Sequence, residues 1–347
     1  MTVTVNVVMG GPSAEHEVSL RSGLEVMNHI DTTAYHARAV VVSRDKLFFF
    51  CDPATPLELA ELANPASPRF EGPLAPAASQ KIWEGCDVAF LALHGSFGED
   101  GLIQGFLETL GVPYTGSGVY GSAVAMEKIT SKVLYLAEGM AVPPWSIYGK
   151  GYRDVSLESL ERTHGYPCFV KAPQSGSSRL MGRADNRQSL AALLEEFSLY
   201  APRLLVETAI AGIEFSCGVI ERADGGIAAL PPIEIRPKDA AFFDFTAKYT
   251  PGKSEEIVPA PRPGPLLDRV KETAVAAHRV LGCRGVSRTD MIFADEKLYV
   301  LETNTLPGLT ANSLLPKEFI AAGGTYAGLI DALITTAITT DAPATTA

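Results

Sequence analysis

The sequence predicts an α/β protein of two or three domains, and three observations support this fold class. The chain has 347 residues, which is more than a single hydrophobic core ordinarily serves. Hydrophobic residues make up 46% of the chain and charged residues 20%, as in folded globular proteins. Near the N-terminus, VTVNVVMGG reads as a strand with a glycine turn, and the next segment has helical spacing. This order of elements is typical of an α/β domain.

The further elements are predicted from hydrophobic periodicity and turn residues. In the first part of the chain we expect a helix over 13–30, strands over 38–43, 46–50 and 87–95, and a Pro- and Ala-rich loop over 63–79. A helix over 122–139 leads to a β-rich segment from 167 to 210. A hairpin over 287–310 and a closing helix over 326–338 follow, and the low-complexity residues 339–347 are expected to be disordered.

Composition narrows the classes of partner and compartment. A net charge of −11 argues against nucleic acid or an anionic membrane as partner, because both need a basic protein face. The first residues lack the charged start of a signal peptide, and no apolar run approaches the length of a bilayer span. The cysteines are odd in number and widely spaced, at Cys51, Cys86, Cys168, Cys217 and Cys283. Such spacing is typical of reduced thiols, so we expect a cytoplasmic protein without disulfides or a zinc site.

The stretch SRTDMIFADEKLYVLETNTLPGLT, residues 287–310, contains two apolar runs that carry acids where a core strand should be apolar. An odd loop centred on Glu296 would set Asp290 opposite Glu302, with Asn304 farther along the same face. Two carboxylates this close repel each other unless a cation or a proton lies between them. Oxygen ligands suit Mg²⁺ or Mn²⁺ rather than zinc, and Mg²⁺ commonly takes its other ligands from phosphate. The hairpin therefore predicts a metal and nucleotide site, and the alternative is a solvated strand edge.

Nucleotide binding needs a device other than the common glycine-rich motifs. GSGVYG, residues 116–121, follows the last strand of its domain rather than the first, which argues against a dinucleotide fold. No P-loop sequence is present. Lys128 and Lys171 lie in largely apolar segments, where an anion would offset the cost of burying their charge. The small residues 175–178 allow backbone N–H groups to approach phosphate. Each lysine alone is more often a surface charge.

Eight stretches, in order, resemble the D-alanine:D-alanine ligases, which are ATP-grasp enzymes, over nearly the whole chain from Val3 to about Ile338. They are GGPSAEHEVSLRSG, LHGSFGEDGLIQGFLETLGVPYTGSG, AMEKITSK, GSS, VETAIAGIEFS, FFDFTAKYTPGKSEEIVPAP, RTDMIF and LETNTLPGLTANSLLP. The resemblance implies a three-domain ATP-grasp fold of the α/β (α+β) class, with an N-terminal Rossmann-like domain on a parallel sheet. The implied domains are 1–116 for substrate, 117–210 for the central ATP-grasp part, 211–338 for the catalytic part and 339–347 for the tail.

The resemblance also implies roles for individual residues. ATP would be held by Lys128, Lys171, Ser178, Glu207, Glu214 and Lys248. Two Mg²⁺ or Mn²⁺ ions would be bound by Asp290, Glu302 and Asn304. Catalysis and substrate binding would involve Glu15, Ser177, Tyr249, Arg288, Gly308 and Ser313. Among these, Glu15 would take the ammonium of the first D-alanine and Ser313 the carboxylate of the second.

In the same resemblance, Ser177 and Tyr249 would complete a hydrogen-bonded network with Glu15. Arg288 and the backbone N–H of Gly308 would stabilise the oxyanion. His94 matches a family histidine near the substrate, although a histidine that ends a strand is more often structural.

The implied reaction joins two D-alanines into D-alanyl-D-alanine through an acyl phosphate, for peptidoglycan precursor synthesis. The segment FDFTAKYTPGKSEE, residues 243–256, is the expected lid that keeps water out. Two alternatives stay open: an ATP-grasp ligase of other D-amino or hydroxy acids, such as D-serine, and a catalytically silent nucleotide-binding regulator. A homodimer is also left open.

The chain departs from the family pattern at two places. Arg179 and Leu180 stand where the family usually has Val-Gly, and Ala172 stands where proline usually follows the strand lysine. The nucleotide loop is therefore expected to be tuned differently. Tyr249, which D-lactate-using relatives usually replace, favours an amino acid as the second substrate.

Overall fold

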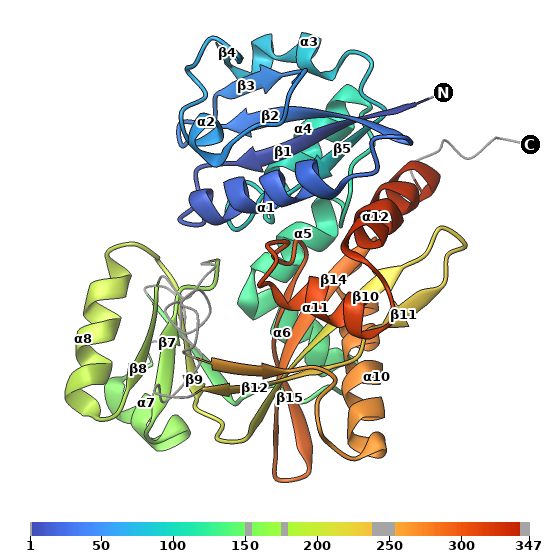
Figure 1. The fold of residues 1–347 in the computed structure, drawn as a ribbon. Coiled ribbons are helices and arrows are strands. Elements are labelled where there is room, and N and C mark those ends of the chain that lie inside the picture. Colours follow the sequence, from blue (N-terminus) through green and yellow to red (C-terminus); the bar gives the residue numbers. More distant parts are fainter. Residues whose placement is uncertain (1, 150–154, 175–179, 238–253, 341–347) are drawn as a thin grey trace, which may run out of the picture.

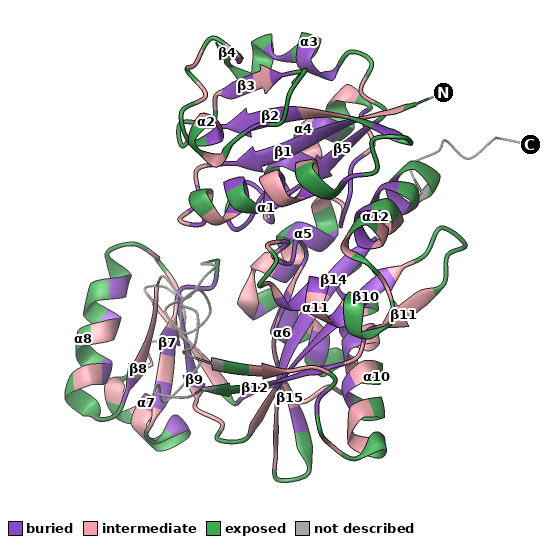
Figure 2. Cartoon of the chain, in the orientation of Figure 1, coloured by how far each residue is buried: buried purple, intermediate pink, exposed green. Residues whose placement is uncertain are grey.

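The computed structural model describes residues 2–149, 155–174, 180–237 and 254–340, and within them the chain forms three β-sheets surrounded by helices (Figure 1). Buried residues follow the centres of the sheets and the inner faces of the helices (Figure 2). The sheets succeed one another along the chain, and the core of the first sheet also includes Ile220 and Val286 of the third.

The first sheet has the strand order β4-β3-β2-β1-β5. Its strands are β1 (Val3–Gly10), β2 (Tyr35–Val42), β3 (Phe48–Cys51), β4 (Glu71–Leu74) and β5 (Val88–Leu91). β1 runs parallel to both β2 and β5, whereas β3 and β4 extend the sheet antiparallel at one edge. Helix α1 (His16–His29) packs on β1 at Gly23, where a Cβ would lie 2.6 Å from the sulfur of Met9. The remaining helical segments here are α2 (Leu59–Ala63), η1 (Pro76–Ala78), α3 (Gln80–Trp83) and α4 (Leu102–Leu110).

The second sheet is antiparallel, with the order β6-β9-β7-β8. Its strands are β6 (Trp145–Tyr148), β7 (Cys168–Lys171), β8 (Met181–Ala184) and β9 (Leu204–Thr208). Helices α7 (Leu157–His164) and α8 (Arg187–Ser198) bury Leu160, Leu190 and Leu194 in its core.

The third sheet follows the order β13-β12-β10-β14-β15, with β11 paired to β10. Its strands are β10 (Ile213–Glu221), β11 (Ile227–Ala229), β12 (Ile233–Pro237), β13 (Ser254–Ile257), β14 (Val286–Ala294) and β15 (Lys297–Asn304). Helix α10 (Gly264–Val280), together with α5 (Val119–Met126) and α6 (Lys128–Ala137), supplies apolar side chains to its core.

The last two helices bridge the first and third sheets. Helix α11 (Leu314–Ala321) lies on β10, whereas α12 (Tyr326–Thr340) packs Leu329 and Leu333 into the core of the first sheet (Figure 1). In the described residues no single helix is long and apolar enough to cross a membrane. One pair, Leu314–Ala321 with Tyr326–Thr339, meets that criterion only jointly and across a bend of 101°.

Three expectations about elements need correction. The predicted loop over 63–79 contains strand β4 and the short helix η1, which add an edge to the first sheet. The predicted helix over 122–139 is broken at Glu127, whose extended backbone (φ −88°, ψ 97°) ends α5 and whose side chain caps α6 at Thr130. The segment 167–210 contains α8 as well as strands. The closing helix is confirmed, but it runs on to Thr340, so the predicted disorder is wrong at 339–340, and residues 341–347 lie outside the described chain.

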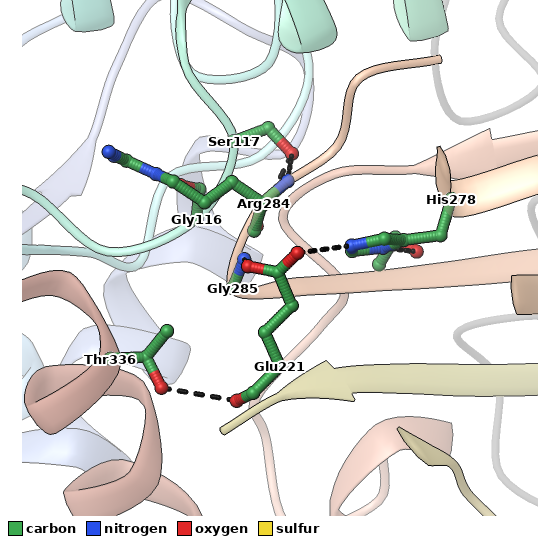
Figure 3. Close-up of polar contacts among 8 residues, drawn as sticks. Gly116, Ser117, Glu221, His278, Arg284, Gly285 and Thr336 are labelled. Atoms are coloured by element: carbon green, nitrogen blue, oxygen red, sulfur yellow. Dashed lines mark hydrogen bonds and ion pairs between the residues drawn. The ribbon is translucent and has the colours of Figure 1, made fainter. Parts of the chain in front are cut away.

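Glu221, at the end of β10, connects that strand to helix α10, to the start of β14 and to helix α12 (Figure 3). Its carboxylate accepts hydrogen bonds from Gly285 N at 2.8 Å and contacts Nε2 of His278 at 3.2 Å. Its carbonyl oxygen accepts from Thr336 on α12. Next to it, the N–H of Arg284 donates to the hydroxyl of Ser117 at 3.1 Å, which fastens the segment leaving the first domain.

Candidate active site

The β14–β15 hairpin places the predicted acids opposite each other, as expected. Asp290 pairs with Glu302, and Arg288 pairs with Asn304. The expected odd loop is wrong, however, because Ala294 pairs with Lys297 and leaves a two-residue turn. Both turn residues have positive φ, 48° and 60°, as a tight hairpin turn requires. A bulge between Asp290 and Met291 then shifts the register by one residue and restores the predicted pair.

Asp290 and Arg288 lie on the same face of β14, two residues apart. The guanidinium of Arg288 donates from Nε and Nη2 to the two carboxylate oxygens of Asp290, at 3.0 and 2.9 Å. Ser216 on β10 donates a further hydrogen bond to Asp290 at 2.7 Å. Both members of the ion pair are largely buried. Burial alone would lower the pKa of Arg288, but the Asp290 carboxylate outweighs it and raises that pKa, so the guanidinium stays charged.

Glu302 has its own cationic partner. Lys128, the first residue of α6, places Nζ 3.1 Å from Oε2 of Glu302. Each of the two facing acids of the hairpin therefore forms an ion pair with a basic side chain, which offsets the repulsion expected between them.

The donor set fits a hard divalent cation. Asp290, Glu302 and Asn304 offer side-chain oxygens from adjacent positions of two strands. Nδ2 of Asn304 is buried without a hydrogen-bonding partner in the described part of the chain. Turning that amide by half a rotation would present its oxygen there instead. Within the described residues, no three His, Cys, Asp or Glu side chains are arranged to hold a metal ion by themselves, so the amide oxygen would be needed to complete the set.

Glu207 lies between two lysines at the end of β9. Lys132 on α6 places Nζ 2.5 Å from Oε1, and Lys171 on β7 forms an ion pair with Oε2. Burial opposes ionisation of Glu207, but the two lysines hold its pKa at about 2. The sequence predicted Glu207 and Lys171 but missed Lys132. The helical spacing of Lys128 and Lys132 was the available signal, because residues four apart share a helix face.

Of the other predicted nucleotide residues, Glu214 and Lys128 lie in the described chain, and the rest lie outside it. Glu214 is half-buried near the start of β10, where it pairs with Ile235 and Ile292. The N–H of Lys128 donates to the carbonyl of Pro173, so α6 begins beside the segment that follows β7. Ser177, Ser178, Arg179, Lys248 and Tyr249, with most of the predicted lid, lie outside the described residues.

Glu15 lies at the start of α1 and is largely buried beside the 94–99 loop. A Cβ on Gly95 would lie 3.0 Å from its Oε2. His94 contacts the hydroxyl of Ser22 through Nε2 at 2.9 Å and the carbonyl of Leu306 through Nδ1 at 3.1 Å. Burial lowers the pKa of His94, although nearby Glu15 opposes this. His94 thereby joins α1 to the 305–310 loop.

Gly308 and Ser313 meet at the N-terminus of α11. A Cβ on Gly308 would lie 2.7 Å from the hydroxyl oxygen of Ser313, so only glycine leaves room for that side chain. The same hydroxyl accepts from Thr310 N at 3.1 Å and lies 2.8 Å from its Oγ1. The segment 305–313, between β15 and α11, thus carries both residues that the resemblance assigned to the oxyanion and the second substrate.

Glu318 is a buried acid that the sequence did not reveal. It is fully buried on α11, where Oε1 accepts from Gly218 N at 3.1 Å. Gly218 is paired with Arg288 in the β10–β14 ladder. Burial raises the pKa of Glu318 well above its usual value, and Arg288 only partly opposes this.

Comparison with known proteins places this arrangement in a family. The model described as "D-ala D-ala ligase N-terminus" matches residues 4–117, and "D-ala D-ala ligase C-terminus" matches residues 134–335. The D-alanine–D-alanine ligase of Syntrophobacter fumaroxidans is 42% identical over 97% of this chain and 98% of that protein. The D-alanine–D-alanine ligase of Leptospira biflexa is 39% identical over 92% and 95%.

Solved structures agree with the sequence comparison. A D-Ala:D-Ser ligase, VanG, from Enterococcus faecalis superposes with a TM-score of 0.84 at 28% identity, covering 96% of this chain and 99% of that one. A D-alanine–D-alanine ligase from Bacillus anthracis complexed with ATP gives 0.75 at 28% identity, covering 98% of both. The expected ATP-grasp fold is confirmed by these neighbours. Since both family models match in chain order and relatives align over almost the full length, this chain belongs to the D-alanine–D-alanine ligase family.

Proposed function

We propose that this protein joins two molecules of D-alanine into D-alanyl-D-alanine at the expense of ATP. The observation that carries the proposal is the 42% identity to a D-alanine–D-alanine ligase over almost the full length of both chains. The geometry supports it, because Lys128 and Arg288 hold the two acids of the hairpin in one buried region.

In the first step, a carboxylate oxygen of the first D-alanine attacks the γ-phosphorus of ATP. The bond from that phosphorus to the bridging oxygen breaks, and ADP leaves. In the proposed roles, Lys171 and Lys128 meet the phosphate charge, and Glu207 and Glu214 accept from the nucleotide. Mg²⁺ held by Asp290, Glu302 and Asn304 would supply further positive charge against the phosphates. In the proposed roles, Ser178 and Lys248 add contacts to the nucleotide.

In the second step, the amine of the second D-alanine attacks the acyl carbon, the carbonyl oxygen becomes negative, and phosphate then leaves as the amine loses a proton. Arg288 and the N–H of Gly308 would stabilise the oxyanion. Glu15 would hold the first ammonium and Ser313 the second carboxylate, with Ser177 and Tyr249 completing the network around Glu15. Holding both substrates in line and away from water protects the acyl phosphate.

The assembly and location are part of the same proposal. We assign the three ranges 1–116, 117–210 and 211–338 to substrate, central and catalytic domains, in accord with the three sheets. Large apolar side chains are exposed on three successive helices, at Leu102, Tyr120, Val133 and Leu136. These would suit a second copy of the chain, and sedimentation of the purified protein tests that. The reaction, which consumes ATP, fits the cytoplasm.

The test is release of phosphate from ATP and Mg²⁺ on addition of D-alanine. We expect turnover with D-alanine and none with L-alanine, because Glu15 and Ser313 fix the ammonium and carboxylate and leave the inverted methyl misplaced. Equal rates with both isomers would contradict the proposal. Adding D-serine or D-lactate with D-alanine, and identifying the product by mass, decides the second substrate. A mixed product that outpaces the D-alanine dimer would replace this proposal with a D-Ala:D-Ser activity for D-serine, or with ester formation for D-lactate.

A further inference from the structure

Helix α6 presents two lysines one turn apart, and each reaches a different sheet. Lys128 lies 3.1 Å from Glu302 on the third sheet, and Lys132 lies 2.5 Å from Glu207 on the second. Residues four apart share one face of a helix, so a single face supplies a cation to acids on both sheets. The role of Lys128 follows from the proposed function, whereas that of Lys132 does not.

The cluster around Glu207 contains one more positive charge than negative charge. Two ammonium groups, Lys132 and Lys171, surround one carboxylate, so the three side chains carry a net charge of +1 when all are ionised. Glu207 is 2% exposed and Lys132 1%, so neither has water as a substitute partner. Burial lowers the pKa of Lys132, and the Glu207 carboxylate opposes that shift.

Lys132 and Lys171 differ in whether their ammonium groups have room to move. Lys171 is the last residue of β7, is 13% exposed, and stands just before the segment predicted to bind phosphate. Its ammonium also lies 5.5 Å from the centre of the Phe169 ring. Lys132 sits in the middle of α6 with its ammonium enclosed. Only Lys171 is placed to turn toward an incoming anion.

We propose that Lys132 is a positioning residue that serves as the permanent counter-ion of Glu207, so that Lys171 is free to turn to the ATP phosphates. This inference rests on the proposed function. An isolated carboxylate in a buried site is costly and takes up a proton instead. With Lys132 in place, Glu207 stays ionised and fixed in position after Lys171 leaves it, ready to accept from the nucleotide.

The test compares nucleotide binding by wild type and Lys132→Met across pH, with a non-hydrolysable ATP analogue and Mg²⁺. From about pH 7.5 upward, phosphate groups whose pKa is near 6 stay ionised and add no slope. We expect a nearly constant Kd for wild type. In the variant, loss of Lys171 to the ligand should force Glu207 to take up a proton, so binding weakens by up to about tenfold per pH unit and is tighter at low pH.

Two control variants separate this effect from a general loss of stability. Lys81→Met removes an exposed lysine that pairs with Glu71 and should leave the pH profile as in wild type. Lys132→Met combined with Glu207→Gln removes both buried charges. That double variant should bind weakly but without the new pH dependence, because no carboxylate remains to titrate. A pH slope that persists in it would overturn the inference.

If Lys132→Met does not fold, a measurement on wild type alone tests the role of Lys132. Calorimetry in two buffers at about pH 8.5 measures proton uptake on binding, and we expect close to zero. Uptake of about one proton would show that Glu207 is neutralised despite Lys132, which overturns the inference. Wild type that binds no ATP analogue would overturn the proposed function itself. Wild type that binds, with a Lys132→Met variant of identical pH profile, would overturn only the role of Lys132.

Discussion

Glu99 accepts a hydrogen bond from the backbone N–H of Leu306 at 3.0 Å, although 207 residues separate them in the chain. The second oxygen of the same carboxyl accepts from Gly95 N at 2.8 Å. This contact, with that of His94, attaches the 305–310 loop and its Gly308 to the first domain. In the proposed function, a substrate between Glu15 and Gly308 would therefore depend on this buried acid.

Glu99 should make stability fall as pH rises. Burial, and then the charge of Glu15, raise the pKa of Glu99 from 4.5 to about 7. Between those values the unfolded chain has lost the proton that the folded protein keeps, so unfolding becomes easier with increasing pH. We expect the free energy of unfolding of wild type, minus that of Glu99→Gln, to fall across this window by about 1 kcal/mol per pH unit. Urea titrations at several pH values measure it, and parallel profiles for the two proteins would contradict the prediction.

Glu302→Gln should lower kcat by orders of magnitude while leaving the fold intact, because an amide holds a divalent cation poorly. The variant also loses the ion pair of Glu302 with Lys128, and because Glu302 is partly exposed this loss of stability should stay below about 1 kcal/mol. Steady-state kinetics and thermal unfolding measure the two effects. A kcat close to that of wild type would contradict the metal site and indicate that Glu302 is simply a solvated residue on a strand edge.

The fold should tolerate Glu318→Gln but should lose stability in Glu318→Ala. Burial raises the pKa of Glu318 well above its usual value and so favours the neutral carboxyl, which an amide resembles, and Glu318→Gln should preserve the contact with Gly218 N. Glu318→Ala leaves that N–H buried without its partner and opens a cavity, at a cost of about 2–4 kcal/mol. The same chemical denaturation assay ranks the two variants. Equal losses would mean that the acid is ionised against Arg288.

Glu221→Gln should destabilise the protein by about 1–3 kcal/mol at neutral pH, because the buried His278 loses a charged partner. Hydrogen bonding to His278 lowers the pKa of Glu221 below 4.5, so its stabilisation is present above that value and is lost as pH falls through the lowered pKa. The difference between wild type and variant should therefore shrink in acid. Glu17→Gln, which removes an exposed partner of Arg44, is the control and should change stability by less than about 0.5 kcal/mol.

The sequence by itself determined the family, the elements with strong periodicity and the chemical types in the site. Asp290 and Glu302 could be paired from their positions because side chains alternate along strands, so a face is readable locally. Even there the loop was wrong, since a bulge that no residue type announces corrected the register.

Only the tertiary structure decided which partner each buried charged or acidic side chain contacts. The pairs Glu207 with Lys132, Glu99 with Leu306 and Glu318 with Gly218 join residues between about 75 and 207 positions apart. Such contacts depend on how helices and sheets pack. The sequence around a lysine or glutamate does not show whether its side chain is solvated or paired with a buried partner. The physical reason is that burial, not residue type, sets the cost of each charge, and burial is a property of the whole fold.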